Sequence, residues 1–232
     1  MKKKILIFGS SKNLGKFLSK KFSKNYSVIQ LSSTLKSNNR NIYNVDITNE
    51  VSLNSTLNMI KKKTNNIDAI IFTVGNSKMS KGNLENFKKS FESNFFSFVN
   101  LINSYSEIFN EKKVKIIVIS SIAGLKSIDA PVEYSVAKSA LIFYAKLISK
   151  KLIKKGISIN IISPGNILMK NNNWFNKIRK NKKKVLNYIR KNVPSGNFVK
   201  PEEIFNICEL IISNKNVNLV GSNIVIDGGQ SI

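Results

Sequence analysis

The chain has 232 residues, of which 38 are basic and 13 acidic, giving a formal net charge of +25. The length and the 42% of hydrophobic residues suit one α/β domain with a substantial core and exclude wholesale disorder. There is no histidine and one cysteine, Cys208, which excludes an internal disulfide, a cysteine- or histidine-based metal site and a Ser-His-Asp mechanism.

No apolar run approaches the roughly 20 residues of a membrane-spanning helix. Residues 1–9 begin with a basic head, but their apolar run is too short for a signal peptide. We therefore expect a cytoplasmic protein without a membrane partner.

The net charge raises the alternative of a nucleic-acid-binding protein. The lysines are spread along the chain, however, and arginine, the usual residue for bidentate phosphate and guanine contacts, occurs only at positions 40, 179 and 190. Lysine, asparagine, isoleucine and phenylalanine all have AT-rich codons, so we attribute most of the charge to genome composition. An acidic partner stays open, with residues 177–184 as the most basic stretch.

Short apolar runs alternate along the chain with stretches of helical periodicity. The runs predict strands at residues 5–8, 28–31, 42–45, 67–74, 114–119, 157–162 and 224–226. The periodicity predicts helices near residues 13–24, 50–62, 84–110, 134–154 and 201–213. Apolar strands separated by helices predict one α/β domain over residues 1–232, a doubly wound, Rossmann-like fold. Its seven-stranded, mainly parallel sheet has helices on both faces and its ligand site beyond the carboxyl ends of the strands.

The first predicted strand runs into Gly-Ser-Ser-Lys-Asn-Leu-Gly at residues 9–15, followed by a helix. Glycine lets the backbone turn close to a pyrophosphate, and the helix N-terminus supplies free N–H groups. The spacing between Gly9 and Gly15 is looser than the standard dinucleotide fingerprint. A glycine that only closes a strand–helix turn therefore stays an alternative.

The second predicted strand ends near Ser32 and Ser33, without the acidic residue that binds a ribose 2′-hydroxyl. A carboxylate at this point would repel a 2′-phosphate. Its absence, together with the basic residues Lys12, Lys36 and Arg40, favours NADP(H) over NAD(H) as the cofactor.

These motifs resemble those of the short-chain dehydrogenase/reductase family, including its 3-oxoacyl-carrier-protein reductase-like members, over essentially the whole chain. The family's Thr-Gly-x3-Gly-x-Gly loop has Phe8 here in place of threonine and Asn13, which tolerates a left-handed backbone, in place of the middle glycine. Asn-Asn-Ala-Gly after the fourth strand becomes residues 72–75, with Gly75 retained. Met169 replaces the threonine expected after Pro-Gly.

The resemblance implies that Asp46 contacts the adenine, with a helix N-cap as the alternative role. It implies a cofactor-binding surface formed by Gly9, Ser11, Lys12, Asn13, Leu14, Gly15, Ser32, Ser33, Asp46, Ile47, Val74, Gly75, Tyr134, Lys138, Pro164, Gly165 and Ile167. Residues 219–229 resemble the family's C-terminal strand signature.

Four residues match the family's catalytic set in chain order: Asn94, Ser121, Tyr134 and Lys138. The Tyr-x3-Lys pair alone carries little information in such a lysine-rich chain. Taken singly, Ser121 fits an ordinary loop serine and Asn94 a solvated helix position. All four in order, behind a dinucleotide loop, indicate an active site.

The residue types suit acid–base chemistry without a metal. A free tyrosine has a pKa near 10, and Lys138, one helical turn beyond Tyr134, is expected to lower that pKa. The resemblance implies that Tyr134 gives a proton to the substrate oxygen while the nicotinamide delivers hydride to the carbonyl carbon. It also implies that Ser121 polarises that oxygen, that Lys138 binds the nicotinamide ribose and that Asn94 holds a water molecule.

Residues 169–198 stand where the family has its substrate-covering segment. Trp174 and other aromatics lie there among lysines, and two interpretations stay open: a lid that touches substrate, or an amphipathic helix pair that docks Trp174 on the domain. A lysine-rich lid suits an anionic substrate, such as an acyl group on an acidic carrier protein or a sugar nucleotide.

The leading hypothesis is an NADP(H)-preferring oxidoreductase that reduces a carbonyl to an alcohol, or the reverse, on a carrier-linked ketone or a sugar derivative. The alternatives are a dinucleotide-binding regulatory protein that has lost turnover and a basic nucleic-acid-binding protein. The resemblance also implies a homodimer or homotetramer, assembled through the predicted helices at 84–110 and 134–154.

Overall fold

The computed structural model describes the whole chain except residues 1, 36–38, 65, 78–81, 110–112 and 214–217. Within the described residues, the strands are β1 (Lys4–Phe8), β2 (Ser27–Ser32), β3 (Ile42–Asn44), β4 (Ala69–Phe72), β5 (Val114–Ile119), β6 (Ile157–Pro164) and β7 (Asn223–Ile226). They form one seven-stranded sheet in the order β3-β2-β1-β4-β5-β6-β7, and every pairing is parallel. This confirms the predicted α/β, Rossmann-like class.

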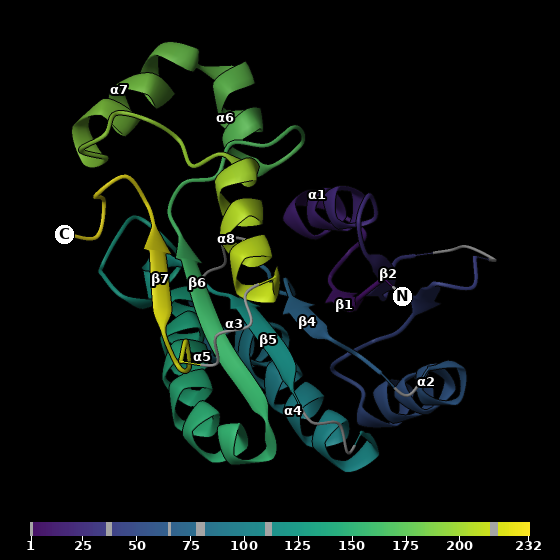
Figure 1. Cartoon of the computed structure of the whole chain (residues 1–232). Coiled ribbons are helices and arrows are strands. Elements are labelled where there is room, and N and C mark those ends of the chain that lie inside the picture. Colours follow the sequence, from purple (N-terminus) through teal and green to yellow (C-terminus); the bar gives the residue numbers. More distant parts are fainter. Residues whose placement is uncertain (1, 36–38, 65, 78–81, 110–112, 214–217) are drawn as a thin grey trace.

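The α-helices are α1 (Asn13–Phe22), α2 (Glu50–Lys63), α3 (Leu84–Phe91), α4 (Ser97–Ile108), α5 (Val132–Leu152), α6 (Asn173–Lys180), α7 (Lys182–Asn192) and α8 (Pro201–Ser213). A π-helix, η1 (Glu92–Phe96), links α3 to α4. Two 3₁₀ turns, η2 (Ile122–Gly124) and η3 (Ile153–Lys155), flank α5. Helices α1 and α8 cover one face of the sheet, and α2, α4 and α5 cover the other (Figure 1).

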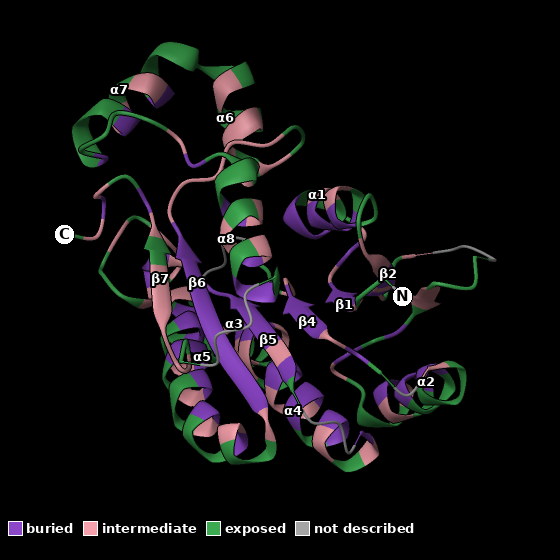
Figure 2. Cartoon of the chain, viewed as in Figure 1, coloured by how far each residue is buried: buried purple, intermediate pink, exposed green. Residues whose placement is uncertain are grey.

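The apolar strands follow from this double cover. Within β1, Ile5 and Ile7 pack in the core cluster with α1 and α8, whereas Leu6 and Phe8 pack in the cluster with α2, α4 and α5. Because both faces are covered, successive residues are all buried and no polar alternation remains. The central strands are accordingly buried along most of their length (Figure 2).

Two predicted elements differ most from the observed ones. The helix predicted near residues 84–110 is divided into α3, η1 and α4, and residue 110 lies outside the described part of the chain. The strand predicted at 67–74 pairs only over Ala69–Phe72, because residues 73–75 leave the ladder to line the carboxyl end of the sheet. The observed helix α5 begins two residues earlier than predicted.

Cys208 lies on α8 and is fully buried in the cluster with α1. Burial raises the pKa of its thiol far above the usual range. Among the described residues, no helix combines the length and hydrophobicity needed to cross a lipid bilayer.

Candidate active site

The predicted site residues gather at one edge of the sheet. Because all these strands are parallel, the segments that follow β1, β2, β4, β5 and β6 begin at the same edge of the sheet. Helices α6 and α7 stand beyond the tips of β6 and β7 at this edge (Figure 1). The topology therefore brings the glycine loop, the catalytic candidates and the predicted substrate-covering segment to the same end of the molecule.

The loop after β1 has the backbone that the motif predicted. Gly9 has φ of 80° and Asn13 has φ of 44°, so asparagine takes the left-handed conformation expected of it. Gly15 packs so closely that a Cβ atom there would lie 2.2 Å from the carbonyl oxygen of Gly9. Lys12 precedes α1 without a side-chain cap, which leaves the backbone N–H groups of the first helical turn available for an anion. This cradle fits a pyrophosphate.

Thr73 is a site residue that the motif comparison did not single out. Its hydroxyl donates a hydrogen bond to the carbonyl oxygen of Phe8 at 2.7 Å, and its backbone N–H donates to the same oxygen at 3.0 Å. Its Oγ1 would also lie 2.5 Å from a Cβ atom at Gly15. Thr73 therefore ties the segment after β4 to the glycine loop, the region where the family's asparagines are missing. A hydroxyl residue directly after a buried strand was the available signal.

Three hydroxyl groups meet where β1 and β2 end. Ser32 and Thr34 each have a hydroxyl 2.8 Å from Oγ of Ser11, to which both donate. Arg40 is exposed nearby in sequence, and Lys36 lies outside the described residues. The position that carries an acid in 2′-hydroxyl-binding sites thus holds hydroxyl donors instead.

Asp46 is exposed after β3, and Ile47 beside it is buried. Oδ1 of Asp46 accepts hydrogen bonds from the N–H of Thr48 at 3.0 Å and its hydroxyl at 2.7 Å. The N-cap of α2 is Asn49, whose side chain accepts from the N–H of Ser52. The alternative role of Asp46 as helix N-cap is therefore wrong, because the N-cap lies three residues later.

Asn94, Lys138 and Gly75 meet in the interior. A Cβ atom at Gly75 would lie 2.7 Å from Oδ1 of Asn94 and 2.9 Å from Nζ of Lys138, so only glycine fits between them. Lys138 is 3% exposed, and its Nζ donates to the carbonyl oxygen of Ile119 at 3.4 Å. Val74, just before Gly75, packs against the core cluster of α2, α4 and α5.

Asn94 is fully buried, so the alternative of a solvated helix position is wrong. It lies in the π-helix η1, a local insertion that often marks functional segments. Its Oδ1 accepts from the N–H of Asn76 at 3.1 Å, and its Nδ2 donates to the carbonyl oxygens of Asn76 and Ser90. Asn94 therefore fixes the segment that follows β4.

Ser121 and Tyr134 are joined by a side-chain hydrogen bond, which makes Ser121 more than an ordinary loop serine. The hydroxyl of Ser121 also accepts from the N–H of Ala123 at 3.2 Å and thereby caps η2. Nζ of Lys138 lies 5.8 Å from the centroid of the Tyr134 ring. The structure thus brings all four catalytic candidates into one network.

Burial dominates the electrostatics of this network. Burial raises the pKa of Tyr134, and the hydrogen bond with Ser121 offsets part of that rise. Burial lowers the pKa of Lys138 to about 8. The expected lowering of the Tyr134 pKa is therefore wrong for the chain alone, since desolvation of the phenolate is the largest influence and raises that pKa. The ordinary tyrosine pKa is near 10 and burial raises it further, so Tyr134 is protonated at neutral pH.

The segment after β6 completes the edge. Pro164 ends β6, and the N–H of Gly165 donates to the carbonyl oxygen of Ile226 at 2.9 Å. Ile167 pairs with Val199 in an isolated parallel bridge. Met169 packs against the core cluster of α1 and α8, so an apolar side chain replaces the hydroxyl expected there.

Residues 173–192 form the helix pair α6 and α7. Ring centroids of Tyr188 and Phe198 lie 5.4 and 5.5 Å from that of Trp174, and Nζ of Lys177 lies 4.7 Å from the Trp174 ring. The hydroxyl of Tyr188 forms a hydrogen bond with Gln230 near the C-terminus. The structure therefore forms a helix pair here, and the ring contacts of Trp174 lie within residues 169–198 themselves and not with the rest of the domain.

Among the described residues, no cluster of cysteine, aspartate and glutamate has the composition of a metal site. A glycine loop with an open helix N-terminus, a buried lysine and a tyrosine bonded to a serine are the features expected of a site for dinucleotide-dependent acid–base chemistry.

Comparison with known proteins points to the same class. A family model described as enoyl-(acyl carrier protein) reductase matches residues 21–231. A 3-oxoacyl-[acyl-carrier-protein] reductase, FabG, from Buchnera aphidicola subsp. Schizaphis graminum is 29% identical, with 99% of this chain and 97% of that protein covered.

Two solved structures share the fold. ElxO with NADP bound has a TM-score of 0.88 at 24% identity and covers 99% of both chains. A short-chain dehydrogenase from Leptospira borgpetersenii with bound NAD+ has a TM-score of 0.86 at 23% identity and covers 100% of this chain and 94% of that one. The chain belongs to the short-chain dehydrogenase/reductase family of oxidoreductases.

Proposed function

We propose that this protein is a nicotinamide-nucleotide-dependent oxidoreductase that interconverts a carbonyl and an alcohol. The observation that carries the proposal is the convergence of Asn94, Ser121, Tyr134 and Lys138 beside the glycine loop. The bound nicotinamide supplies the hydride in the reducing direction and accepts it in the oxidising direction.

The chain's own residues handle the proton. Tyr134 holds a proton on its hydroxyl at neutral pH, as a tyrosine with an ordinary or raised pKa does, and it donates this proton to the carbonyl oxygen during reduction. Ser121, already bonded to Tyr134, donates to the same oxygen. The ammonium group of Lys138 stabilises the phenolate that remains. Asn94 keeps the segment after β4 in place around that ammonium group.

Replacing Tyr134 by phenylalanine tests the proposal. Tyr134→Phe should lower kcat on a confirmed carbonyl substrate by at least about 10³-fold, because the proton donor is lost, and leave the Kd for NADPH within a few-fold. Tyr144→Phe, on the same helix but packed against Phe95 and Phe98, should keep normal turnover. A Tyr134→Phe protein with most of its activity would contradict the proposal.

We propose a preference for NADP(H) over NAD(H). Ser32 and Thr34 donate to Ser11, whose own hydroxyl hydrogen can be offered to a 2′-phosphate, and none of the three carries the negative charge that would repel it. Ser32→Asp should reverse the preference, measured as the ratio of the two Kd values. Ser27→Asp, at the opposite end of β2, adds the same charge and should leave the ratio unchanged. Tighter NADH than NADPH binding by the unaltered protein would overturn this preference.

We propose that residues 169–198 cover the substrate and that the substrate is a ketone carried on an acidic carrier protein. Helices α6 and α7 present basic residues in their last turns, and the Buchnera relative is a 3-oxoacyl-[acyl-carrier-protein] reductase. A screen should compare a 3-oxoacyl group on carrier protein with the same group on free pantetheine. The same screen should include a sugar ketone. Faster turnover of the sugar ketone than of the carrier-bound ketone would contradict the carrier-protein proposal.

We also propose that residues 1–232 form one domain and that it assembles as a homodimer or homotetramer. Helix α5 and the neighbouring η1 carry exposed apolar side chains at Phe96, Val136, Phe143 and Leu147. On α5 these positions are spaced by seven and four residues, so they share one face. A second copy of the chain would cover this face.

A further inference from the structure

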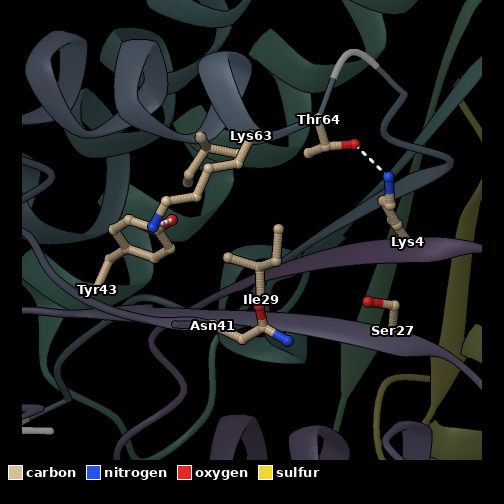
Figure 3. Close-up of a pocket in the computed structure, with 8 residues that line it drawn as sticks. Lys4, Ser27, Ile29, Asn41, Tyr43, Lys63 and Thr64 are labelled. Carbon is tan, nitrogen blue, oxygen red and sulfur yellow. Dashed lines mark hydrogen bonds between the residues drawn. The ribbon is translucent and has the colours of Figure 1, made fainter. Parts of the chain in front are cut away.

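A pocket of about 100 Å³ opens at the edge of the sheet opposite the glycine loop (Figure 3). It lies where β1 and β2 begin, since Lys4 and Ser27 are the first residues of those strands. Its remaining wall comes from the start of β3 and the end of α2. The lining residues are Lys4, Ser27, Ile29, Asn41, Tyr43, Ile60, Lys63 and Thr64.

Two ammonium groups stand on opposite sides of Ile29 in this pocket (Figure 3). Nζ of Lys4 donates to the hydroxyl of Thr64. Nζ of Lys63 donates to the hydroxyl of Tyr43 at 3.0 Å and lies 5.1 Å from the centroid of that ring. An ammonium group has three N–H donors, so these bonds hold both cations in place without using all of their donors.

No acidic side chain is found among the described residues that line the pocket. Among the described residues, the one ion pair within 4 Å joins Lys89 to Glu85, so neither pocket lysine is neutralised by a carboxylate. Asp68 is close in the fold, but its carboxylate accepts from the backbone N–H of Lys4 at 2.7 Å and does not line the pocket. Positive charge therefore prevails within it.

The end of α2 does not reverse this balance. A helix C-terminus carries about half a negative elementary charge, which disfavours an anion. The last turn of α2 carries three lysines, at positions 61, 62 and 63, and these outweigh the partial charge of the helix end. Ile29 and Ile60 are buried and form an apolar floor, which limits screening by water.

We propose that this pocket binds an oxyanion of phosphate size, either free phosphate or the phosphoryl group of a small ester. The two ammonium groups supply the charge, and the hydroxyl of Ser27 and the amide of Asn41 supply neutral polar groups around the anion. The site is independent of the proposed catalytic function, because it lies at the other end of the strands.

The test is calorimetric titration of the full chain with inorganic phosphate at constant ionic strength and saturating NADPH, which blocks the cofactor site. Lys63→Gln removes one pocket cation, and Lys62→Gln removes the adjacent lysine of α2, which does not line the pocket. Unaltered protein and Lys62→Gln should bind one phosphate with Kd values within two-fold. Lys63→Gln should weaken binding by at least ten-fold.

Lys63 is exposed, so its replacement is not expected to disturb folding, and circular dichroism checks this point. Equal weakening by both variants would overturn the proposal, since it would show attraction to the overall charge of the chain. Absence of saturable binding would overturn it as well. A parallel titration with glycerol 2-phosphate separates the two sources: tighter binding of the ester indicates a phosphorylated metabolite, and tighter binding of phosphate indicates the free ion.

Discussion

Lys138 places its ammonium group in the interior, where it contacts the carbonyl oxygen of Ile119 and lies beside Asn94 and Gly75. Lys138, Asn94 and Gly75 were identified from the sequence through their positions in motifs. Their burial could not be predicted, because Tyr-x3-Lys and a lone asparagine look the same on a solvated helix as on a buried one. The pKa directions follow from burial and so required the structure.

Lys138 should make the stability of the unliganded protein depend on pH. Its pKa is about 8 when folded and near 10.5 when unfolded, so the unfolded chain binds more protons between these values. Stability should therefore rise with pH across this window. The cost of burying the charge is present in full below about pH 8, and it disappears near pH 10.5.

Lys138→Met should accordingly stabilise the unliganded protein at pH 7 by roughly 1–3 kcal/mol, and the gain should vanish near pH 10.5. Urea unfolding at several pH values measures this difference. Lys146→Met, at an exposed position on the same helix, is the control and should show no such pH-dependent gain. A gain for Lys138→Met that is equal at pH 7 and pH 10.5 would contradict the assignment.

At the scale of elements, the strands and most helices were predictable because a parallel sheet covered on both faces needs continuous apolar runs. β5 matches its predicted limits at Val114–Ile119. The π-helix η1 was not predictable, since one inserted residue leaves the apolar periodicity of residues 84–108 almost unchanged. Lysines obscured the periodicity of α6 and α7, so that segment could be read either as a lid or as a helix pair.

The start of α1 offers a test at this scale. Asn13 holds a left-handed backbone, which β-branched residues adopt only at a cost. Asn13→Val should destabilise the protein by about 1–2 kcal/mol and weaken NADPH binding, because the first turn of α1 would shift. Asn13→Gly should preserve both properties. Urea unfolding and a cofactor titration provide the measurements. Equal stability and equal NADPH affinity of the two variants would show that neither property depends on the backbone angle at residue 13.

At the scale of the whole molecule, the family's course of strands and helices was predictable, and the positions of charges in space were not. The sequence pointed to residues 177–184 as the most basic stretch, whereas the fold gathers Lys4 and Lys63 at one pocket from distant parts of the sequence. The sequence predicts the order of the elements along the chain. Which strand ends become neighbours follows only from the order of the strands in the sheet.

The apolar face of α5 leads to a prediction about assembly. Phe143 is 65% exposed and Leu147 is 54% exposed, and a second copy of the chain would remove both from water. The double variant Phe143→Glu, Leu147→Glu should lower the molar mass measured by light scattering to that of a smaller assembly. A matched double variant on α1, Lys16→Glu and Lys20→Glu, changes exposed residues on the other side of the sheet and should leave the molar mass unchanged. A protein that is already monomeric before substitution would contradict the proposal.

The buried thiol of Cys208 can report when helix α8 separates from helix α1. A thiol that is fully buried and has a raised pKa reacts with an aromatic disulfide reagent only when α8 separates from α1. In native buffer the labelling rate should be far below that of the urea-unfolded chain, and saturating cofactor should slow it further if α1 is held by the ligand. Because there is one cysteine, each labelled molecule records one event at one place. The labelling rate of the Cys208 thiol thus measures how often α8 separates from α1, without any engineered probe.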